Sequence, residues 1–221
     1  MKINAVIFDM DGVILDSEKV YIRFWCEAGK ACGYPFEKKH ALAIRSMARP
    51  YAIEKLKSFF GGDFDYDLVR NKRIELMGKY VDEYGLEKKP YSDYILKYLK
   101  DKGYKAALAT ATPAERAKKY LKRVELLDYF DEIVSAHMVK RGKPAPDIYE
   151  YAAEKLGLKP ENCMAVEDSP NGARSAISAG CVTVIVPDMD KPEGAILNKV
   201  YKVTDSLKDI SGLIEKINGE N

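Results

Sequence analysis

The sequence of 221 residues predicts an α/β fold, a doubly wound parallel sheet with a small helical domain inserted after the first strand. Short apolar runs alternate with segments of helical periodicity through most of the chain, as expected when a covering helix follows each strand. Two of the expected strand-to-helix junctions also carry capping residues. Residues 16–87 break the alternation with helical patterns and no convincing strand.

The expected strands are short and continuous in their apolar character. Such runs are typical of strands that helices cover on both faces, because neither face then needs polar residues. The five runs are Ala5–Phe8, Ala106–Ala109, Ile133–Ser135, Met164–Val166 and Val182–Val186.

Helical spacing of apolar residues marks both the segments between these runs and the insertion. Between the runs it appears at Ala117, Leu121, Val124 and Leu127, and again at Ile148, Tyr151, Ala152 and Leu156. In the insertion it appears at Tyr21, Phe24, Trp25, Ala28 and Cys32, and at Val69, Leu76, Tyr80 and Tyr84. We therefore expect a core domain made of residues 1–15 and 91–221, a helical domain at 16–90, and a returning linker near Tyr84–Pro90.

Two junctions show where the expected helices begin. At Thr112–Glu115 we predict a capping box, with the threonine as N-cap, a proline at the first helical position and the glutamate at N3. Ser169-Pro170 predicts a second helix start of a similar kind. Both junctions place the residues just before them, Thr110 and Glu167-Asp168, at the carboxyl ends of strands, where open α/β sheets build their sites.

The composition is that of an ordinary globular protein, with 47% hydrophobic and 32% charged residues. A formal net charge of +2 provides no general attraction to nucleic acid or to membrane surfaces, and no apolar stretch is long enough to span a bilayer. The first residues lack the long apolar region of a signal peptide, and the four cysteines show no Cys-x-x-Cys pair. We expect a cytoplasmic monomer with no nucleic-acid or membrane partner.

Acidic residues follow two of the expected strands. Asp9-Met10-Asp11-Gly12 ends the first strand, and Glu167-Asp168 ends another. Taken alone, the first pair is equally typical of residues that cap a turn. If the two strand ends lie side by side, however, three or four carboxylates converge there and repel one another unless a cation holds them together. Oxygen ligands without a nearby histidine or thiolate favour Mg²⁺.

Groups suited to phosphate occur at the same predicted edge. Lys143 lies on a proline-flanked turn, and Thr110 supplies a hydroxyl just before the start of a helix. The backbone N–H groups that follow Thr110 point from a helix N-terminus, which is a natural binding place for a phosphate.

Together these residues resemble the four motifs of the haloacid dehalogenase superfamily. Asp9–Gly12, Thr110, Lys143 and Glu167-Asp168 occur in the order and context of those motifs, and the helical insertion resembles the superfamily's cap. The resemblance covers essentially the whole chain and implies a Rossmann-like core. It further implies a phosphoric monoester hydrolase that acts on a small phosphorylated metabolite.

The resemblance also implies a role for each motif residue. Asp9 would be the nucleophile that forms an aspartyl-phosphate, and Asp11 the general acid and base. Mg²⁺ would be held by the Asp9 side chain, the Asp11 backbone carbonyl and Asp168. Glu167 would be either a further ligand or a residue that orients the ligands without touching the ion. The phosphoryl oxygens would be bound by Thr110, the Ala111 N–H and Lys143.

Within the superfamily, DMDGVILDS, KPAPDI and EDSPNG look like the branch that contains β-phosphoglucomutase and the sugar-phosphate phosphatases. Tyr21 stands where the mutases carry a histidine, and Pro113-Ala114 stands where they have a Lys-Asn pair. Tyr21 also lies on the apolar stripe of its helix, so packing and substrate contact both remain open. Arg45 and Arg49 stand where the mutases contact the far end of the sugar phosphate, although a solvated helix face is the alternative for each.

These departures from the mutase pattern favour hydrolysis of the phosphate ester over its transfer within the sugar. We therefore predict a Mg²⁺-dependent phosphatase of small phosphate monoesters, with sugar phosphates as the expected class. The alternatives are a phosphosugar mutase resembling β-phosphoglucomutase, or a catalytically silent binding module on the same fold.

Overall fold

A six-stranded, entirely parallel sheet forms the centre of the protein in the computed structural model, which describes residues 2–189 and 194–219. The strand order is β3-β2-β1-β4-β5-β6, so the order reverses between β1 and β4. Their bounds are β1 Ala5–Phe8, β2 Lys105–Thr110, β3 Glu132–Ser135, β4 Cys163–Glu167, β5 Val182–Ile185 and β6 Lys202–Val203. A crevice outside the carboxyl ends of the strands is expected where the order reverses, here between β1 and β4.

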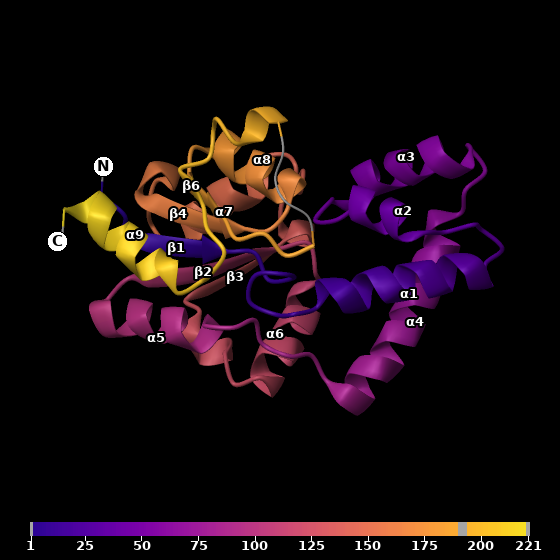
Figure 1. Cartoon of the computed structure of the whole chain (residues 1–221), viewed down its shortest axis with the longest axis horizontal. Coiled ribbons are helices and arrows are strands. Elements are labelled where there is room, and N and C mark those ends of the chain that lie inside the picture. Colours follow the sequence, from indigo (N-terminus) through magenta and orange to yellow (C-terminus); the bar gives the residue numbers. More distant parts are fainter. Residues whose placement is uncertain (1, 190–193, 220–221) are drawn as a thin grey trace.

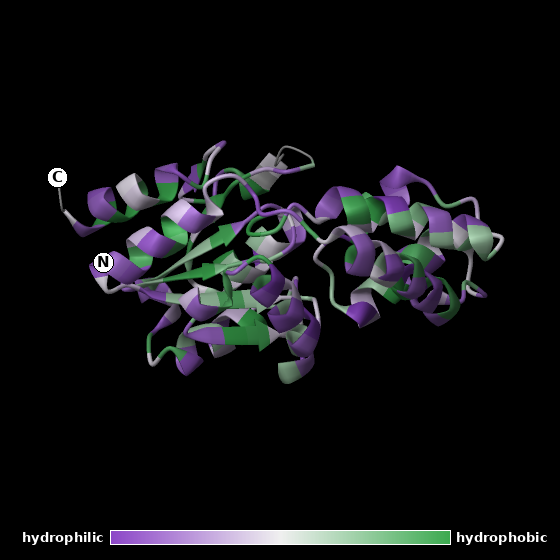
Figure 2. Ribbon diagram, turned by 90° about the horizontal axis from the view of Figure 1, so that it is seen from below, coloured by the Kyte–Doolittle hydropathy of each residue, from purple (hydrophilic) through white to green (hydrophobic). Residues whose placement is uncertain are grey.

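Helices cover both faces of the sheet (Figure 1). They are α5 Ser92–Lys102, α6 Ala114–Arg123, α7 Asp147–Lys155, α8 Pro170–Ala179 and α9 Asp209–Asn218. Short 3-10 turns occur at η1 Leu127–Tyr129, η2 Ala136–Met138, η3 Pro160–Asn162 and η4 Gly194–Ile196. Figure 2 shows hydrophobic residues concentrated on the strands, while the helices carry residues of both kinds.

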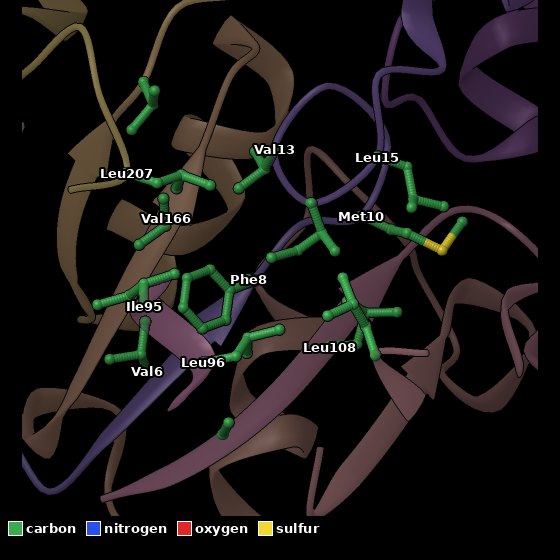
Figure 3. Packing of buried hydrophobic residues seen from close by; sticks show 14 of the residues in the cluster. Val6, Phe8, Met10, Val13, Leu15, Ile95, Leu96, Leu108, Val166 and Leu207 are labelled. Atoms are coloured by element: carbon green, nitrogen blue, oxygen red, sulfur yellow. The ribbon is translucent and has the colours of Figure 1, made fainter. Parts of the chain in front are cut away.

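The two faces of the sheet follow the alternation of side chains along β1. Val6 and Phe8 point to one face, where they join the cluster formed with α5, α6 and α9 (Figure 3). Ala5 and Ile7 point to the other face, against α7 and α8. Because all four side chains are fully buried, this strand is apolar at every position, as the sequence predicted.

Helices α1–α4 form a separate group to one side of the sheet (Figure 1). Their bounds are α1 Glu18–Ala31, α2 Lys38–Ala43, α3 Arg49–Phe60 and α4 Tyr66–Tyr84. This group has its own buried cluster, in which Trp25 stacks on Phe36 with ring centroids 5.8 Å apart. The chain enters and leaves the group along one path, because Leu15 pairs with Lys88 in an antiparallel bridge and the Lys89 N–H donates to the Ile14 carbonyl.

The predicted fold class is confirmed, and the five predicted strands occur with ends shifted by no more than one residue. The sheet also contains β6, which the sequence did not predict because this strand has only two residues, one of them a lysine. Among the described residues, no helix combines the length and the apolar character needed to cross a bilayer.

The predicted capping box at Thr112 is wrong, whereas the cap at Ser169 is confirmed. Helix α6 begins at Ala114 with Pro113 as N-cap, and the Thr112 hydroxyl donates to Asp11 instead of capping the helix. Ser169 does cap α8, accepting from the Gly172 N–H at 3.1 Å. A nearby buried carboxylate therefore decided which partner the Thr112 hydroxyl takes.

Candidate active site

Asp9 stands at the carboxyl end of β1, where the chain must turn. Its N–H donates to the Val166 carbonyl at 3.0 Å, which continues the pairing of β1 with β4 past the last strand residue. Gly12 has a φ of +88°, and a Cβ there would lie 2.2 Å from Asp168 Oδ2. Both the backbone angle and the lack of space require glycine, so the turn brings the first and last motifs into contact.

Three buried carboxylates meet at this edge, those of Asp9, Glu167 and Asp168. One oxygen from each lies within 4.8 Å of the others, and none of the three residues is more than 2% exposed. Asp9 Oδ2 and both carboxylate oxygens of Asp168 have no hydrogen-bond partner among the described residues. Buried carboxylate oxygens without partners are the donor set that a hard divalent cation such as Mg²⁺ requires.

Lys143 is the buried cation of this edge, only 1% exposed. Its Nζ lies 2.6 Å from Asp9 Oδ1 and 2.5 Å from Glu167 Oε1, and it donates to the Ala109 carbonyl at 2.8 Å. Burial lowers the pKa of Lys143, but the two carboxylates outweigh burial and raise its pKa above the ordinary value. With the three carboxylates ionised, the Lys143 ammonium group and the Arg45 guanidinium, whose Nη1 lies 3.8 Å from Asp168 Oδ2, still leave a net negative charge at this edge, which favours a bound cation.

Glu167 is the most firmly held of the three acids. Besides Lys143, it receives a hydrogen bond from the Tyr149 hydroxyl at 2.6 Å, and Ser169 Oγ lies 3.4 Å from its second oxygen. A Cβ on Gly172 would lie 2.0 Å from its carboxylate carbon, so α8 packs directly against this side chain. Its oxygens are therefore engaged, whereas those of Asp168 accept no hydrogen bond from the described residues.

The pKa of Asp9 is raised to about 7 by its surroundings. Burial is the largest cause, Lys143 acts against it, and the charges of Glu167 and Asp11 raise the pKa further. Protein groups alone therefore leave Asp9 partly protonated near neutral pH, and a nearby cation would favour its anionic, nucleophilic form.

Asp11 lies apart from the three clustered carboxylates. Its Oδ1 accepts from the Ser17 hydroxyl at 2.6 Å and its Oδ2 from the Thr112 hydroxyl at 2.9 Å. Tyr21 is 3.2 Å from Thr112 Oγ1, and since that hydroxyl's only proton goes to Asp11, Tyr21 is the donor in this contact. Burial raises the pKa of Asp11, while the two hydroxyls partly offset this effect. The arrangement orients a carboxyl group suited to exchanging protons near neutral pH.

The residues after β2 form the wall beside these acids. Thr110 is fully buried, and its hydroxyl accepts from the Thr112 N–H at 3.0 Å. Ala111, the next residue, lines the pocket together with Asp9 and Asp11. The pocket has a volume of about 460 Å³ and lies between the sheet edge and helices α1–α4.

The substrate-contact residues predicted on the helical group occupy different positions. Tyr21 packs against the core cluster, and its ring also lines the pocket, so both of its predicted roles remain compatible with the geometry. Arg45 reaches the acidic edge: its Nη2 donates to the Asp168 carbonyl at 2.9 Å. Arg49 lies at the pocket wall, where an exposed ion pair of 2.5 Å holds it to Asp67.

Sequence reasoning missed several charged residues that line the same pocket. They are Glu18 on α1, Arg70 and Arg73 on α4, Arg116 on α6, and Lys140 and Arg141 in the loop after η2. The spacing of Arg70 and Arg73 puts them on one helix face, which was the available signal. Charged residues at such spacing usually mark a solvated face, so only the structure separates these arginines from the many others.

Comparison with known proteins decides the family. The model of the haloacid dehalogenase-like hydrolases matches residues 3–180, well over half of the sequence. The chain belongs to the haloacid dehalogenase-like hydrolase family. The resemblance predicted from the motifs is thereby confirmed, as is the prediction that the protein is an enzyme of the hydrolase class.

Individual members of the haloacid dehalogenase-like family show how similar this chain is to them. It is 34% identical over 218 residues to the phosphorylated carbohydrates phosphatase of Thermotoga maritima, covering 96% of this chain and 90% of that one. It is 30% identical over 189 residues to the β-phosphoglucomutase of Bacillus subtilis, with 82% of each chain covered. The solved β-phosphoglucomutase of Clostridium difficile superposes with a TM-score of 0.81 at 24% identity, over 97% of this chain and 98% of the other.

Proposed function

We propose that this member of the haloacid dehalogenase-like hydrolases is a Mg²⁺-dependent phosphoric monoester hydrolase that cleaves small sugar phosphates through an aspartyl-phosphate on Asp9. One observation carries the proposal: the buried Asp9 carboxylate lines the pocket with one oxygen bound by Lys143 and the other without a hydrogen-bond partner among the described residues. Its relatedness to a phosphorylated carbohydrates phosphatase supports the substrate class.

The first half of the reaction transfers the phosphoryl group to Asp9. A carboxylate oxygen of Asp9 forms a bond to phosphorus as the bond to the sugar oxygen breaks, and Asp11 gives its proton to the departing oxygen. Ser17 and Thr112 hold the Asp11 carboxyl in one orientation for this transfer. Lys143, Thr110 and the Ala111 N–H bind the phosphoryl oxygens, whose charge must be stabilised in the transition state.

The second half returns the enzyme to its starting state. Asp11, now a carboxylate, takes a proton from a water molecule whose oxygen bonds to phosphorus. The bond between phosphorus and the Asp9 oxygen then breaks, releasing inorganic phosphate and the free Asp9 carboxylate. Asp11 therefore ends the cycle protonated, which its raised pKa favours.

The Asp9 and Asp168 side chains and the backbone carbonyl of Asp11 would hold Mg²⁺ at the acidic edge. When bound, the cation supplies positive charge that offsets the charge of the phosphoryl oxygens. Glu167 is already bound by Lys143 and Tyr149, so in this proposal it does not touch the ion and instead orients the lysine.

Residues 16–90 act in this proposal as a cap domain over the core made of residues 1–15 and 91–221. Three contacts support the closed arrangement. Arg45 donates to the Asp168 carbonyl, Asn171 Nδ2 donates to the Arg45 carbonyl at 3.0 Å, and the Ala48 N–H donates to the Lys143 carbonyl at 2.9 Å. Such closure keeps bulk water away while the aspartyl-phosphate forms. Arg45 then positions Asp168, while Tyr21 and Arg49 face the sugar.

The second candidate is a phosphosugar mutase, which the 30% identity to a β-phosphoglucomutase favours. Against it, Tyr21 replaces a histidine, and burial and the Asp11 charge raise the pKa of Tyr21 above its ordinary value. A tyrosine with a raised pKa cannot exchange its proton near neutral pH as a histidine does. With β-glucose 1-phosphate as substrate, a mutase yields glucose 6-phosphate, whereas a phosphatase yields glucose and inorganic phosphate.

The test of hydrolysis is release of p-nitrophenol from p-nitrophenyl phosphate, followed by a screen of sugar phosphates. We expect activity with Mg²⁺, its loss on chelation with EDTA, and its loss in Asp9→Asn. The matched control is Asp101→Asn, which removes an exposed carboxylate of α5. Turnover that survives both chelation and Asp9→Asn would overturn the proposal, and a complete lack of turnover would favour a silent binding module.

A further inference from the structure

Arg73 is a buried guanidinium without a carboxylate partner among the described residues. It is 5% exposed, lines the pocket, and lies over the rings of Tyr21 and Trp25 at 5.0 and 5.1 Å from their centroids. Its Nη1 contacts Met77 Sδ at 3.6 Å, and its Nε has no hydrogen-bond partner in the described part of the chain. Cation–π contacts stabilise such a group only in part, so a buried arginine with unused donors indicates a ligand.

Two further arginines line the same pocket close to Arg73. Arg70 lies one turn before it on α4, and Arg116 comes from the first turn of α6 in the core. Both are partly buried, and neither forms an ion pair with any described residue. Burial lowers the pKa of Arg73, Tyr21 and Tyr66 counter this, and the positive charges of Arg116 and Arg70 lower the pKa again. Because the charges of Arg116 and Arg70 act on Arg73, an anion bound beside it would be stabilised by more than one guanidinium group.

The other arginines of the pocket already have partners. Arg45 is bound to Asp168, Arg49 pairs with Asp67, and Arg141 pairs with Asp147 at 2.8 Å. Lys140, another cation of the pocket wall, is exposed, so the buried and partly buried guanidinium groups without an ion pair to a described residue are Arg70, Arg73 and Arg116.

We infer that Arg70, Arg73 and Arg116 form a second anion subsite, which selects substrates carrying a phosphate or carboxylate in addition to the phosphoryl group that meets Asp9. This inference rests on the proposed function and names its substrate class. Asp9, Asp11 and the three arginines line one pocket of about 460 Å³, so a single small substrate contacts both sets of residues. The planar guanidinium fork binds phosphate and carboxylate through paired hydrogen bonds, which a neutral hydroxyl cannot match.

The test compares matched substrates that differ by one anionic group. Fructose 1,6-bisphosphate is compared with fructose 1-phosphate, and 6-phosphogluconate with the open-chain sorbitol 6-phosphate, each by kcat/KM. We expect at least one doubly anionic substrate to exceed its partner by about tenfold or more. Arg73→Met is expected to reduce that ratio by at least about tenfold, and Arg73→Lys to retain part of it. The pair that shows the preference identifies the second anion as phosphate or carboxylate.

Two additional variants separate the subsite from folding effects and from general loss of charge. Arg116→Met removes a less buried guanidinium and is expected to lower the same ratio, with thermal unfolding confirming the fold. Arg23→Met is the control, since that exposed arginine of α1 pairs with Glu27 outside the pocket. An unchanged ratio in both Arg73→Met and Arg116→Met, or no preference in the parent enzyme, overturns the inference. If Asp9-dependent hydrolysis persists in that case, the proposed function stands and only the subsite is refuted.

Discussion

The acidic edge formed by Asp9, Glu167, Asp168 and Lys143, called the floor below, and the α4 wall of the pocket carry opposite charges and stabilise them by different means. Of the four floor residues, Asp9 lines the pocket. At the floor, Lys143 forms short ion pairs with Asp9 and Glu167, yet Asp168 keeps two carboxylate oxygens without hydrogen-bond partners in the described chain. At the wall, Arg73 lies on aromatic rings and no described carboxylate pairs with it. The floor thus retains negative charge and the wall positive charge. The proposed Mg²⁺ site at the floor and the inferred anion subsite at the wall both rest on this difference.

The largest expected effect on activity comes from removing the positive charge of Lys143 from the floor. Lys143→Met leaves Asp9 and Glu167 without their ammonium partner and deprives the phosphoryl group of a positive contact. We expect kcat/KM for p-nitrophenyl phosphate to fall by about 10³-fold, measured beside Lys97→Met, which breaks an exposed pair with Asp101. Near-normal turnover by Lys143→Met would mean that the floor needs no fixed cation.

Magnesium is expected to stabilise the fold more strongly as the pH rises. The pKa of Asp9 is raised from 3.8 to about 7 and that of Asp168 is also raised, mainly by burial, so the folded chain holds protons that the unfolded chain loses. Without metal, the free energy of unfolding therefore falls between about pH 4 and about pH 7. A Mg²⁺ concentration 100 times the Kd at pH 7.5 should add about 2.7 kcal/mol at that pH. The same concentration should add less at pH 5.5, where protonation of the ligands raises the Kd.

Thermal unfolding with EDTA or with Mg²⁺ at the two pH values measures this effect. Asp9→Asn is expected to reduce both the pH dependence and the response to Mg²⁺. Equal stabilisation of the parent and Asp9→Asn proteins would place the cation elsewhere.

Removal of the Asp168 carboxylate should weaken the binding of Mg²⁺ while leaving Lys143 in place. Asp168→Asn keeps the shape of the side chain but loses the charge of its two oxygens, which accept no hydrogen bond from the described residues. The Mg²⁺ concentration for half-maximal activity is expected to rise at least about tenfold. An unchanged Mg²⁺ requirement would contradict a role for Asp168 as a ligand.

A smaller effect on activity is expected from removing the hydrogen bond that the Tyr149 hydroxyl donates to Glu167. Tyr149→Phe removes the hydroxyl that donates to Glu167 at 2.6 Å while keeping the buried ring. We expect kcat to fall about tenfold, the rate equivalent of one charge-assisted hydrogen bond, with little change in KM. Tyr151→Phe on the same helix is the control, and a loss confined to KM would argue against this positioning role.

The smallest effect should come from the exposed ion pair of the wall. Arg49→Met breaks the pair with Asp67, whose two side chains are each more than half exposed. The free energy of unfolding is expected to change by less than about 0.5 kcal/mol, measured by urea denaturation. A loss of several kcal/mol would show that Arg49 belongs with the buried arginines.

The floor could be predicted from the sequence because its residues lie in short motifs at the ends of apolar strands. Parallel strands bring such ends to one edge, so the sequence predicts that Asp9 and Asp168 share that edge. That they are in contact follows from the pairing of β1 with β4, which the structure provides. The wall could not be predicted in this way, since Arg73 and Arg116 reach the pocket only through the packing of α4 and α6 from distant parts of the chain. The error at Thr112 has a similar origin, because the competing partner Asp11 lies 101 residues away.

The two chain segments that enter and leave helices α1–α4 are paired near Leu15 and Lys88, and this pairing affects how the helices can move. Two chain segments joined by hydrogen bonds at the same place resist twisting far more than two independent linkers do. We therefore expect any motion of helices α1–α4 to be a swing about the line of this short ribbon. A motion with one such axis returns Arg45, Arg70 and Arg73 to the same positions over the sheet edge each time the two parts meet.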